Sequence, residues 1–242
     1  MKAIIDGDMI VYRAAFGSEK EIKWCDDVYT LHMDMNEALD KVATIIDSIL
    51  AKLNTSQFSL AFSPKKTFRH ELFDGYKANR ADKRKPLGLG DLISRVKSQY
   101  DGLLYANIEA DDVIGLICTK DRNCVAVSGD KDFLTLPCKF YNFLKDELIE
   151  TSEEEANYNH LIQTLTGDVV DGYSGIKGVG IKTAEKLLAK TGATWEGVVD
   201  IYTSKGYTED IALLNAQLAY ILRDGDYDFD KQELIKLWGN KL

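Results

Sequence analysis

The sequence predicts an α/β fold with a largely parallel sheet flanked by helices, followed by a helical region. Short apolar segments typical of buried strands alternate with amphipathic helical segments over residues 1–150. Strand signals fade after about residue 150, while helix-start and helix-end residues continue. We therefore expect an α/β core at 1–150 and a C-terminal helical region at 151–242.

The expected elements of the core follow from local patterns. A buried strand ends at Asp6, and because Asp6 and Asp8 interrupt the apolar run, we expect a turn after it rather than a signal peptide. Asp34 and Glu37 can form a capping box, and apolar residues then recur at helical spacing. The expected elements are strands at 3–5, 57–62, 103–106 and 124–127, and helices at 34–53, 92–96 and 110–118.

The second part of the chain reads as helical. A segment with helix-start chemistry, SEEEANYNHLIQTLTG, precedes further expected helices at 181–190, 195–202 and 209–222, while YDFDKQELIKLW stays unassigned. No apolar run approaches the roughly 18 residues that a membrane span requires, so we expect a cytoplasmic protein and no membrane partner. The sequence leaves the oligomeric state open, with a monomer as the default expectation.

The composition limits the possible chemistry. The four cysteines form no CxxC pair and the three histidines are scattered, which argues against a zinc site and against a nucleophile–histidine pair. Eight cations and three anions between Pro64 and Pro86 give that segment a net charge of +5. Because the whole chain carries −9, the remainder carries −14. The segment is either a solvated basic loop or a surface for phosphates.

Carboxylates follow the ends of several expected strands. Asp6 ends one strand, Asp130 and Asp132 follow another, and Glu109, Asp111 and Asp112 begin a helix after a third. Open α/β sheets bind ligands beyond the carboxyl ends of their strands. Each residue alone could cap a helix, but several converging carboxylates would repel one another unless cations neutralise them. Oxygen ligands without His or Cys indicate Mg²⁺ or Mn²⁺, and paired ions suit phosphoryl transfer.

Two further segments indicate contacts with phosphate. TFRHELFDGYKANRADKRKP interleaves aromatic residues with cations, which is typical of single-stranded nucleic-acid surfaces. In GIKGVGIKT, Gly175 and Gly180 match the spacing of a P-loop, but Ile181 displaces Lys182 and Thr183 by one position. No strand precedes Gly175 either, so an NTPase is disfavoured. The alternative is a hairpin that holds a backbone phosphate of a duplex.

Taken in order, five segments resemble the flap endonuclease/5′→3′ exonuclease family, most of all its compact phage-encoded members. They are IIDGD, TFRHELFDGYKANR, IEADDVIG, SGDKDF and GDVVDGYSGIKGVGIKTAEKLL. The resemblance implies a PIN-like core, a basic arch or clamp at about 64–90 and a helix–three-turn–helix element at about 160–190. It also implies two-metal (Mg²⁺) hydrolysis of DNA near a free 5′ end or flap, and of the RNA in RNA–DNA hybrids.

The resemblance also implies roles for individual residues. Lys77 and Arg80 would face the scissile phosphate, and Tyr76 would stack on a base. Some relatives bind K⁺ at the glycine turn. The implied metal ligands, direct or through water, are Asp6, Glu109, Asp111, Asp112, Asp130, Asp132, Asp168 and Asp171. The implied nucleic-acid contacts are Arg69, Tyr76, Lys83, Arg84, Lys85, Gly178, Gly180, Lys182 and Thr183.

One position departs from the family pattern. Many relatives carry an Asp just after the second strand, whereas this chain has Ser63 and Pro64 there. One outer carboxylate is therefore missing, and weaker metal affinity at one site is expected. The departure keeps open a second interpretation, in which the chain is a non-catalytic, structure-specific nucleic-acid-binding module.

Overall fold

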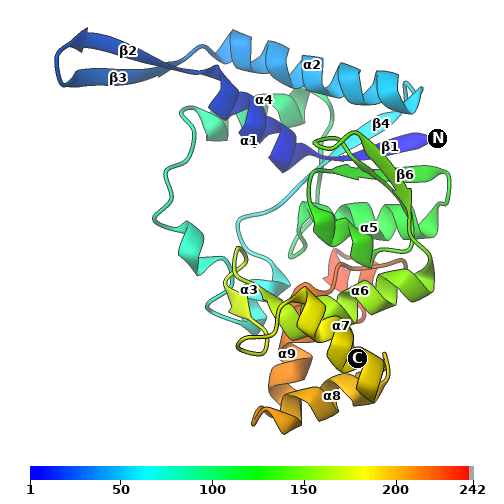
Figure 1. Ribbon diagram of the computed structural model, residues 1–242. Coiled ribbons are helices and arrows are strands. Elements are labelled where there is room, and N and C mark those ends of the chain that lie inside the picture. Colours follow the sequence, from blue (N-terminus) through cyan, green and yellow to red (C-terminus); the bar gives the residue numbers. More distant parts are fainter. Residues whose placement is uncertain (240–242) are drawn as a thin grey trace.

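A six-stranded sheet forms the centre of the computed structural model, which describes residues 1–239 (Figure 1). Residues 240–242 of the expected helical region lie outside this range. The sheet is parallel except for β8, which pairs antiparallel with β7 at one edge. Its strands, in spatial order, are β5 (Leu103–Leu104), β4 (Phe58–Phe62), β1 (Lys2–Asp6), β6 (Cys124–Ser128), β7 (Lys139–Asn142) and β8 (Glu147–Glu150). The predicted α/β class is confirmed.

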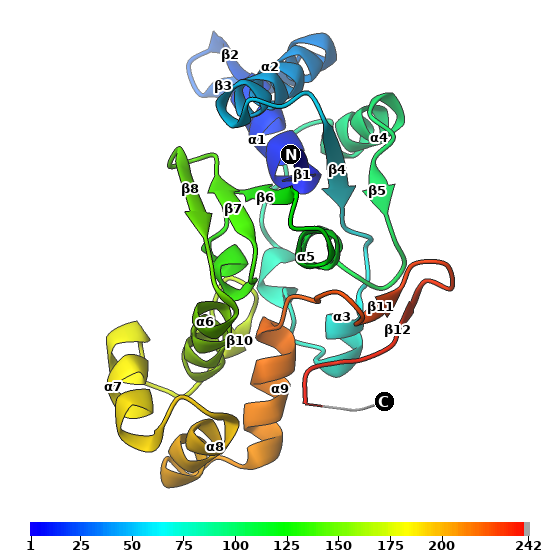
Figure 2. The ribbon, with the colours of Figure 1, turned by 90° about the vertical axis from the view of Figure 1, so that its right-hand side faces the viewer.

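Helices cover both faces of this sheet, which explains why its strands read as continuous apolar runs. Ala3 and Ile5 of β1 pack under α1 (Gly7–Ser18), α2 (Met35–Leu53) and α4 (Leu89–Gln99). Ile4, which points to the opposite face, packs with α5 (Ala110–Lys120). Figure 2 shows α5 on the opposite side of the sheet from the other three helices. The carboxyl ends of β1, β4 and β6 are thereby aligned at one edge.

Helix α2 begins as its sequence predicts, but its cap is simpler. The Asp34 carboxylate accepts hydrogen bonds from the backbone N–H groups of Asn36 and Glu37. The Glu37 side chain does not complete a capping box, because it forms ion pairs with Lys20 and Lys41. Asp34 therefore caps the helix alone, and Glu37 joins α2 to the neighbouring hairpin.

The second part of the chain is predominantly helical, as predicted. Its helices are α6 (Glu153–Thr166), α7 (Ile181–Thr191), α8 (Trp195–Ser204) and α9 (Glu209–Ala219). Two short hairpins accompany them, β9 (Gly167–Asp168) with β10 (Tyr173–Ser174), and β11 (Tyr227–Asp228) with β12 (Glu233–Leu234). Helix α6 contacts the 3₁₀ turn η2 (Lys131–Thr135) of the core, and α9 contacts α3 (Phe68–Leu72). The division near residue 150 stays a prediction.

Two parts of the fold differ from the expectation. Helix α1 starts where a turn was expected, because Asp6 is its N-cap and accepts a hydrogen bond from the N–H of Met9. A long hairpin, β2 (Glu19–Cys25) with β3 (Val28–Met33), then projects from the body between α1 and α2 (Figure 1). Its residues are exposed on both faces, so it lacks the alternation that predicts a half-buried strand.

The basic segment follows an open path between α3 and α4, with only the short 3₁₀ turn η1 (Ala78–Arg80) between them (Figure 1). Lys77 has a positive φ of 55°, which interrupts any continuous helix through Tyr76 and Arg80. The Arg84 guanidinium binds both oxygens of Glu19 at 2.6 and 2.8 Å, and the Leu87 N–H donates to the same carboxylate. Glu19 therefore fastens the far end of this segment to the base of the β2–β3 hairpin.

A buried ion pair joins the two parts of the chain. Arg69 in α3 and Asp112 in α5 are 3% and 0% exposed and form two hydrogen bonds of 2.7 and 2.8 Å. Arg69 also donates to the carbonyl oxygens of Leu218 and Tyr220, and Asp112 accepts from the N–H of Leu222. One pair thus holds α3, the start of α5 and the chain after α9 together.

Removing one member of this pair should be strongly destabilising, because the other charge would stay buried without a partner. Asp112→Ala should lower the free energy of unfolding by about 3–5 kcal/mol, measured by denaturant titration with circular dichroism. The double change Arg69→Met with Asp112→Leu should recover much of that loss. Asp26→Ala, at an exposed ion pair with Lys23, is the control and should change little. If Asp112→Ala and Asp26→Ala lower the free energy of unfolding equally, the buried ion pair does not have the stabilising role assigned to it.

Candidate active site

The carboxyl ends of β1 and β6 bring Asp6 and Ser128 together. The Ser128 hydroxyl donates to Asp6 Oδ2 at 2.9 Å, while the N–H of Met9 donates to Asp6 Oδ1 at 3.0 Å. Asp6 is only 6% exposed. Burial raises its pKa to about 6, and repulsion by Asp8 and Asp130 adds to the effect. Asp6 is thus a buried carboxylate with like charges beside it.

Three more of the predicted metal ligands are linked to Asp6, either directly or through Asp130. Burial raises the pKa of Asp111 well above its ordinary value, and repulsion by Asp6, Asp130 and Glu109 raises it further. The pKa of Asp132 is also raised, first by burial and then by Asp130. Asp130 accepts from the N–H of Asp132 at 3.0 Å, and so caps η2. Asp6, Asp111 and Asp130 therefore lie within reach of one another, with Asp132 next to Asp130, and we name these four residues the inner carboxylates.

Glu109 and Asp171 lie beside a different set of partners. Lys77 Nζ is 2.8 Å from both oxygens of Glu109 and 3.9 Å from Asp171 Oδ2. Arg80 pairs with the other oxygen of Asp171. Burial opposes ionisation of Glu109, but Arg69 and Lys77 hold its pKa below the ordinary value. For Asp171, burial outweighs Lys77 and Arg80, so its pKa is raised.

The loop at 168–171 is fixed by its own side chain and by the basic segment. Asp168 Oδ1 accepts from the N–H groups of Val170 and Asp171, which folds the loop on itself. The backbone N–H of Lys77 donates to the carbonyl oxygen of Asp171 at 2.8 Å, and Asn79 donates to Val169. The start of the helical region thus lies against the segment that carries the candidate catalytic cations.

Three residues near these carboxylates were not predicted. Asp8 is half-buried, and its Oδ2 accepts from the N–H of Ser63 at 2.8 Å. Gln163 of α6 donates to Asp132 Oδ2 at 2.7 Å, and Ser128 holds Asp6. Asp8 was detectable, since it lies two residues after Asp6, in the first turn of α1. Gln163 and Ser128 had no local signal, because only the packing of α6 and β6 brings them here.

Three predicted roles do not fit the positions found. Asp112 is not available as a metal ligand, because Arg69 and two backbone N–H groups occupy its oxygens. Arg69 is likewise too buried to contact nucleic acid. Tyr76 is 2% exposed, and its hydroxyl lies 3.0 Å from Glu109 and 3.1 Å from Asp171. Tyr76 therefore supports those carboxylates, and in this conformation its ring is not free to stack on a base.

The other predicted cations of the basic segment are exposed. Lys83 and Lys85 face solvent, and so does Arg84 in spite of its pairing with Glu19. Arg80 has 44% of its side chain exposed beside Asp171. These side chains can reach a polyanion without unfolding the segment, in contrast to Arg69.

The glycine turn lies between β10 and α7, on the same side as the 168–171 loop. It lines a hollow of about 420 Å³ formed by residues 174–180 together with Thr166 and Val169. Gly178 has a φ of 79°, which side chains rarely adopt, and Gly180 is the N-cap of α7. Lys182 and Thr183 are exposed in the first turn of α7. Backbone N–H groups and a cation are therefore presented together at a helix N-terminus.

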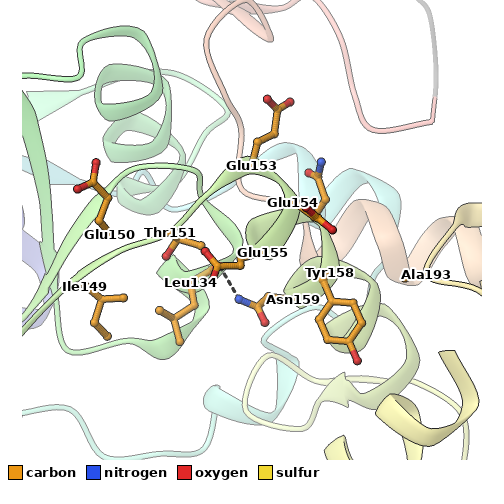
Figure 3. A pocket seen from close by; sticks show the side chains of 11 residues that line it. Leu134, Ile149, Glu150, Thr151, Glu153, Glu154, Glu155, Tyr158, Asn159 and Ala193 are labelled. Carbon is orange, nitrogen blue, oxygen red and sulfur yellow. Dashed lines mark hydrogen bonds between the residues drawn. The ribbon is translucent and has the colours of Figure 1, made fainter. Parts of the chain in front are cut away.

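A separate cavity contains none of these groups. It has a volume of about 860 Å³ and lies between the end of β8 and the start of α6 (Figure 3). Its lining includes Glu150, Glu153 and Glu154, Leu134 and Tyr158, and none of the predicted site residues. Because it combines no inner carboxylate with a basic side chain, it is not the candidate active site.

Within residues 1–239, no three His, Cys, Asp or Glu side chains are arranged as a ready metal site. The inner carboxylates nevertheless have the donor chemistry of one, since all are oxygen ligands whose mutual repulsion a divalent cation would relieve. Helices in this range are too short or too polar to cross a lipid bilayer.

The raised pKa of Asp6 predicts a pH-dependent cost of folding. An Asp with a folded-state pKa of about 6 destabilises the protein above pH 6, and this cost fades as pH falls towards 4. In chelator, Asp6→Asn should therefore raise the free energy of unfolding by about 1–2 kcal/mol at pH 8, after allowing for weaker hydrogen bonds. The gain should vanish near pH 4. Exposed Asp74→Asn is the control, and a pH-independent effect of Asp6→Asn would refute the prediction.

Comparison with known proteins places the chain in a family. Residues 2–164 match the model described as "5'-3' exonuclease, N-terminal resolvase-like domain". The exonuclease of Escherichia phage T7 is 30% identical, across 97% of this chain and 92% of the relative. The exodeoxyribonuclease of Enterobacteria phage T3 is 28% identical with similar coverage. DNA polymerase I of Geobacillus stearothermophilus is 28% identical, but the match spans only 29% of that protein.

Solved structures support the same fold. The T5 5′-exonuclease with bound zinc superimposes with a TM-score of 0.69 at 17% identity, covering 90% of this chain and 89% of that one. The catalytic core of Rad2 in complex with DNA substrate gives a TM-score of 0.52 at 14% identity, covering 85% and 64%. The family model and the near full-length phage relatives together decide the classification. The chain belongs to the 5′–3′ exonuclease family.

Proposed function

We propose that this chain is a Mg²⁺-dependent 5′ nuclease that hydrolyses phosphodiester bonds of DNA, as an exonuclease, a flap endonuclease or both. The observation that carries the proposal is the group of inner carboxylates together with Glu109 and Asp171, which pair with the cations Lys77 and Arg80. We extend the proposed substrates to the RNA strand of RNA–DNA hybrids, as in primer removal. Relatives support the proposal, since T5 structures are described with metal ions and with DNA.

The inner carboxylates would hold the ions, with Glu109, Asp168 and Asp171 as further ligands, directly or through water. When bound, such ions supply an activated water and stabilise the leaving oxygen. The chain's own residues would prepare the site. Ser128 and Gln163 orient Asp6 and Asp132, and Tyr76 holds Glu109 against Asp171. Lys77 and Arg80 would bind the scissile phosphate.

The glycine turn would grip the duplex at a distance from the cut. Its hollow, with the N-terminus of α7 and Lys182, suits a backbone phosphate. K⁺ at this turn is part of the proposal. The exposed cations Lys83, Arg84 and Lys85 would follow the strand near its 5′ end.

Cleavage should depend on a divalent ion and on the inner carboxylates. With a 5′-labelled duplex, wild-type protein should release labelled products in Mg²⁺ and none in chelator. Asp130→Asn with Asp132→Asn should abolish turnover while leaving DNA affinity in Ca²⁺ or chelator within about threefold, because no phosphate-binding cation is removed. Product lengths on blunt, nicked and flapped duplexes would separate exonuclease from flap endonuclease action.

Activity that survives chelation, or no cleavage of any 5′-ended substrate, would refute the nuclease proposal. If the double variant behaves like wild type in every assay, the chain is instead the non-catalytic binding module. That alternative is kept because Ser63 stands where many relatives carry a carboxylate.

The two cationic regions should have separable effects. Lys182→Ala should weaken duplex binding and reduce the slope of log K against log salt by about one unit, if one phosphate contact is lost. Lys77→Ala and Arg80→Ala should reduce cleavage more than affinity, since they act at the scissile phosphate. Binding by fluorescence anisotropy at several salt concentrations, beside single-turnover cleavage, measures both. An exchange of the two phenotypes would contradict this division.

A further inference from the structure

The Lys77 ammonium lies between two carboxylates, and a third is connected to this position through a neighbouring residue. It contacts both oxygens of Glu109 at 2.8 Å and lies 3.9 Å from Asp171. Glu109 precedes α5, Asp171 follows β9, and Asp8 comes from α1. Only 22% of the Lys77 side chain is exposed, so water screens these contacts poorly.

Asp8 is connected to this position through Ser63. Its Oδ2 accepts a hydrogen bond from the N–H of Ser63, and the Ser63 hydroxyl accepts one from the N–H of Ala110. Because Ala110 directly follows Glu109, these two bonds tie a carboxylate of α1 to the chain beside Glu109.

We propose that the Lys77 ammonium occupies a cation position formed by Asp8, Glu109 and Asp171, and that a divalent ion binds there only after Lys77 has left. This inference rests on the proposed metal-dependent function, and it adds Asp8 to the site. The ammonium acts as an internal counter-ion that keeps these carboxylates together without metal. Metal binding would then release the Lys77 ammonium to bind the phosphate. One exchange would thus fill the metal position and make the cation available.

The backbone around Lys77 allows its side chain to move alone. Its N–H is bound to the carbonyl oxygen of Asp171, and its positive φ is fixed within the η1 turn. Gly172 packs directly on this turn, since a Cβ there would lie 2.7 Å from the carbonyl oxygen of Gly75. None of these contacts involves the ammonium. Departure of the ammonium from Glu109 thus requires side-chain rotation only.

The test is metal affinity without DNA. Mn²⁺ binding to the full chain, measured by electron paramagnetic resonance of the free ion, should be about tenfold tighter in Lys77→Met, because a competing charge is removed. Asp8→Asn should weaken Mn²⁺ binding by at least about threefold, because one carboxylate charge is lost. Lys66→Met and Asp74→Asn, at exposed positions, are the matched controls and should bind as wild type does.

A second measurement uses only the wild-type protein, so its result does not depend on whether the variants fold. Acetylation of Lys77, followed by mass spectrometry, should be slow in chelator and several-fold faster in Mn²⁺, while acetylation of Lys66 stays constant. If wild type binds Mn²⁺ but Lys77→Met binds equally or more weakly, the exchange is refuted and the nuclease proposal survives. Unchanged affinity in Asp8→Asn removes Asp8 from the site. Absence of Mn²⁺ binding in all variants refutes both proposals.

Discussion

The buried ion pair between Arg69 and Asp112 is the contact on which the arrangement of the site depends. Asp112 lies in the first turn of α5, directly after Glu109 and Asp111, so its position fixes where those carboxylates point. Arg69 begins the segment that leads to Tyr76, Lys77 and Arg80, and it also binds the chain after α9. Because both charges are buried, neither can leave the other without a large cost. The pair therefore sets the basic segment against the acidic rim.

Around this ion pair, the carboxylates of the site fall into two groups that differ in their cationic partners. Among the inner carboxylates, burial and neighbouring carboxylates raise the pKa values of Asp6, Asp111 and Asp132, and Lys131 forms an ion pair with Asp132. Glu109 and Asp171 instead meet Lys77 and Arg80. The fold thus pairs Glu109 and Asp171 with cations of the basic segment, whereas Asp6 and Asp111 are buried among like charges.

The β2–β3 hairpin and Glu19 have a related structural role. Glu19 holds Arg84 and the N–H of Leu87, so the exposed basic segment is fastened at its far end as well as at Asp171. A segment fixed at both ends but open between them keeps Lys83 and Lys85 available while its path stays defined. Its net charge of +5 contrasts with the −14 of the remaining chain.

The sequence by itself determined the alternation of strands and helices and the acidic residues at strand ends, because periodicity and strand-end chemistry are local properties. It also identified the family, since the five ordered motifs can be recognised without knowing which residues are in contact. Helix α1 and the hairpin after it were not predicted. Helix α1 was missed because it begins directly at its cap residue, with no turn after the strand. The hairpin was missed because neither of its faces is buried. Only the tertiary structure decided which charged side chains are left available to bind a ligand. Asp112 and Arg69 are far apart in the chain and look like their neighbours in sequence, yet packing pairs them and removes both from the site. Gln163 and Ser128 were found for the same reason: the packing of α6 and β6, rather than spacing along the chain, brings them to Asp132 and Asp6.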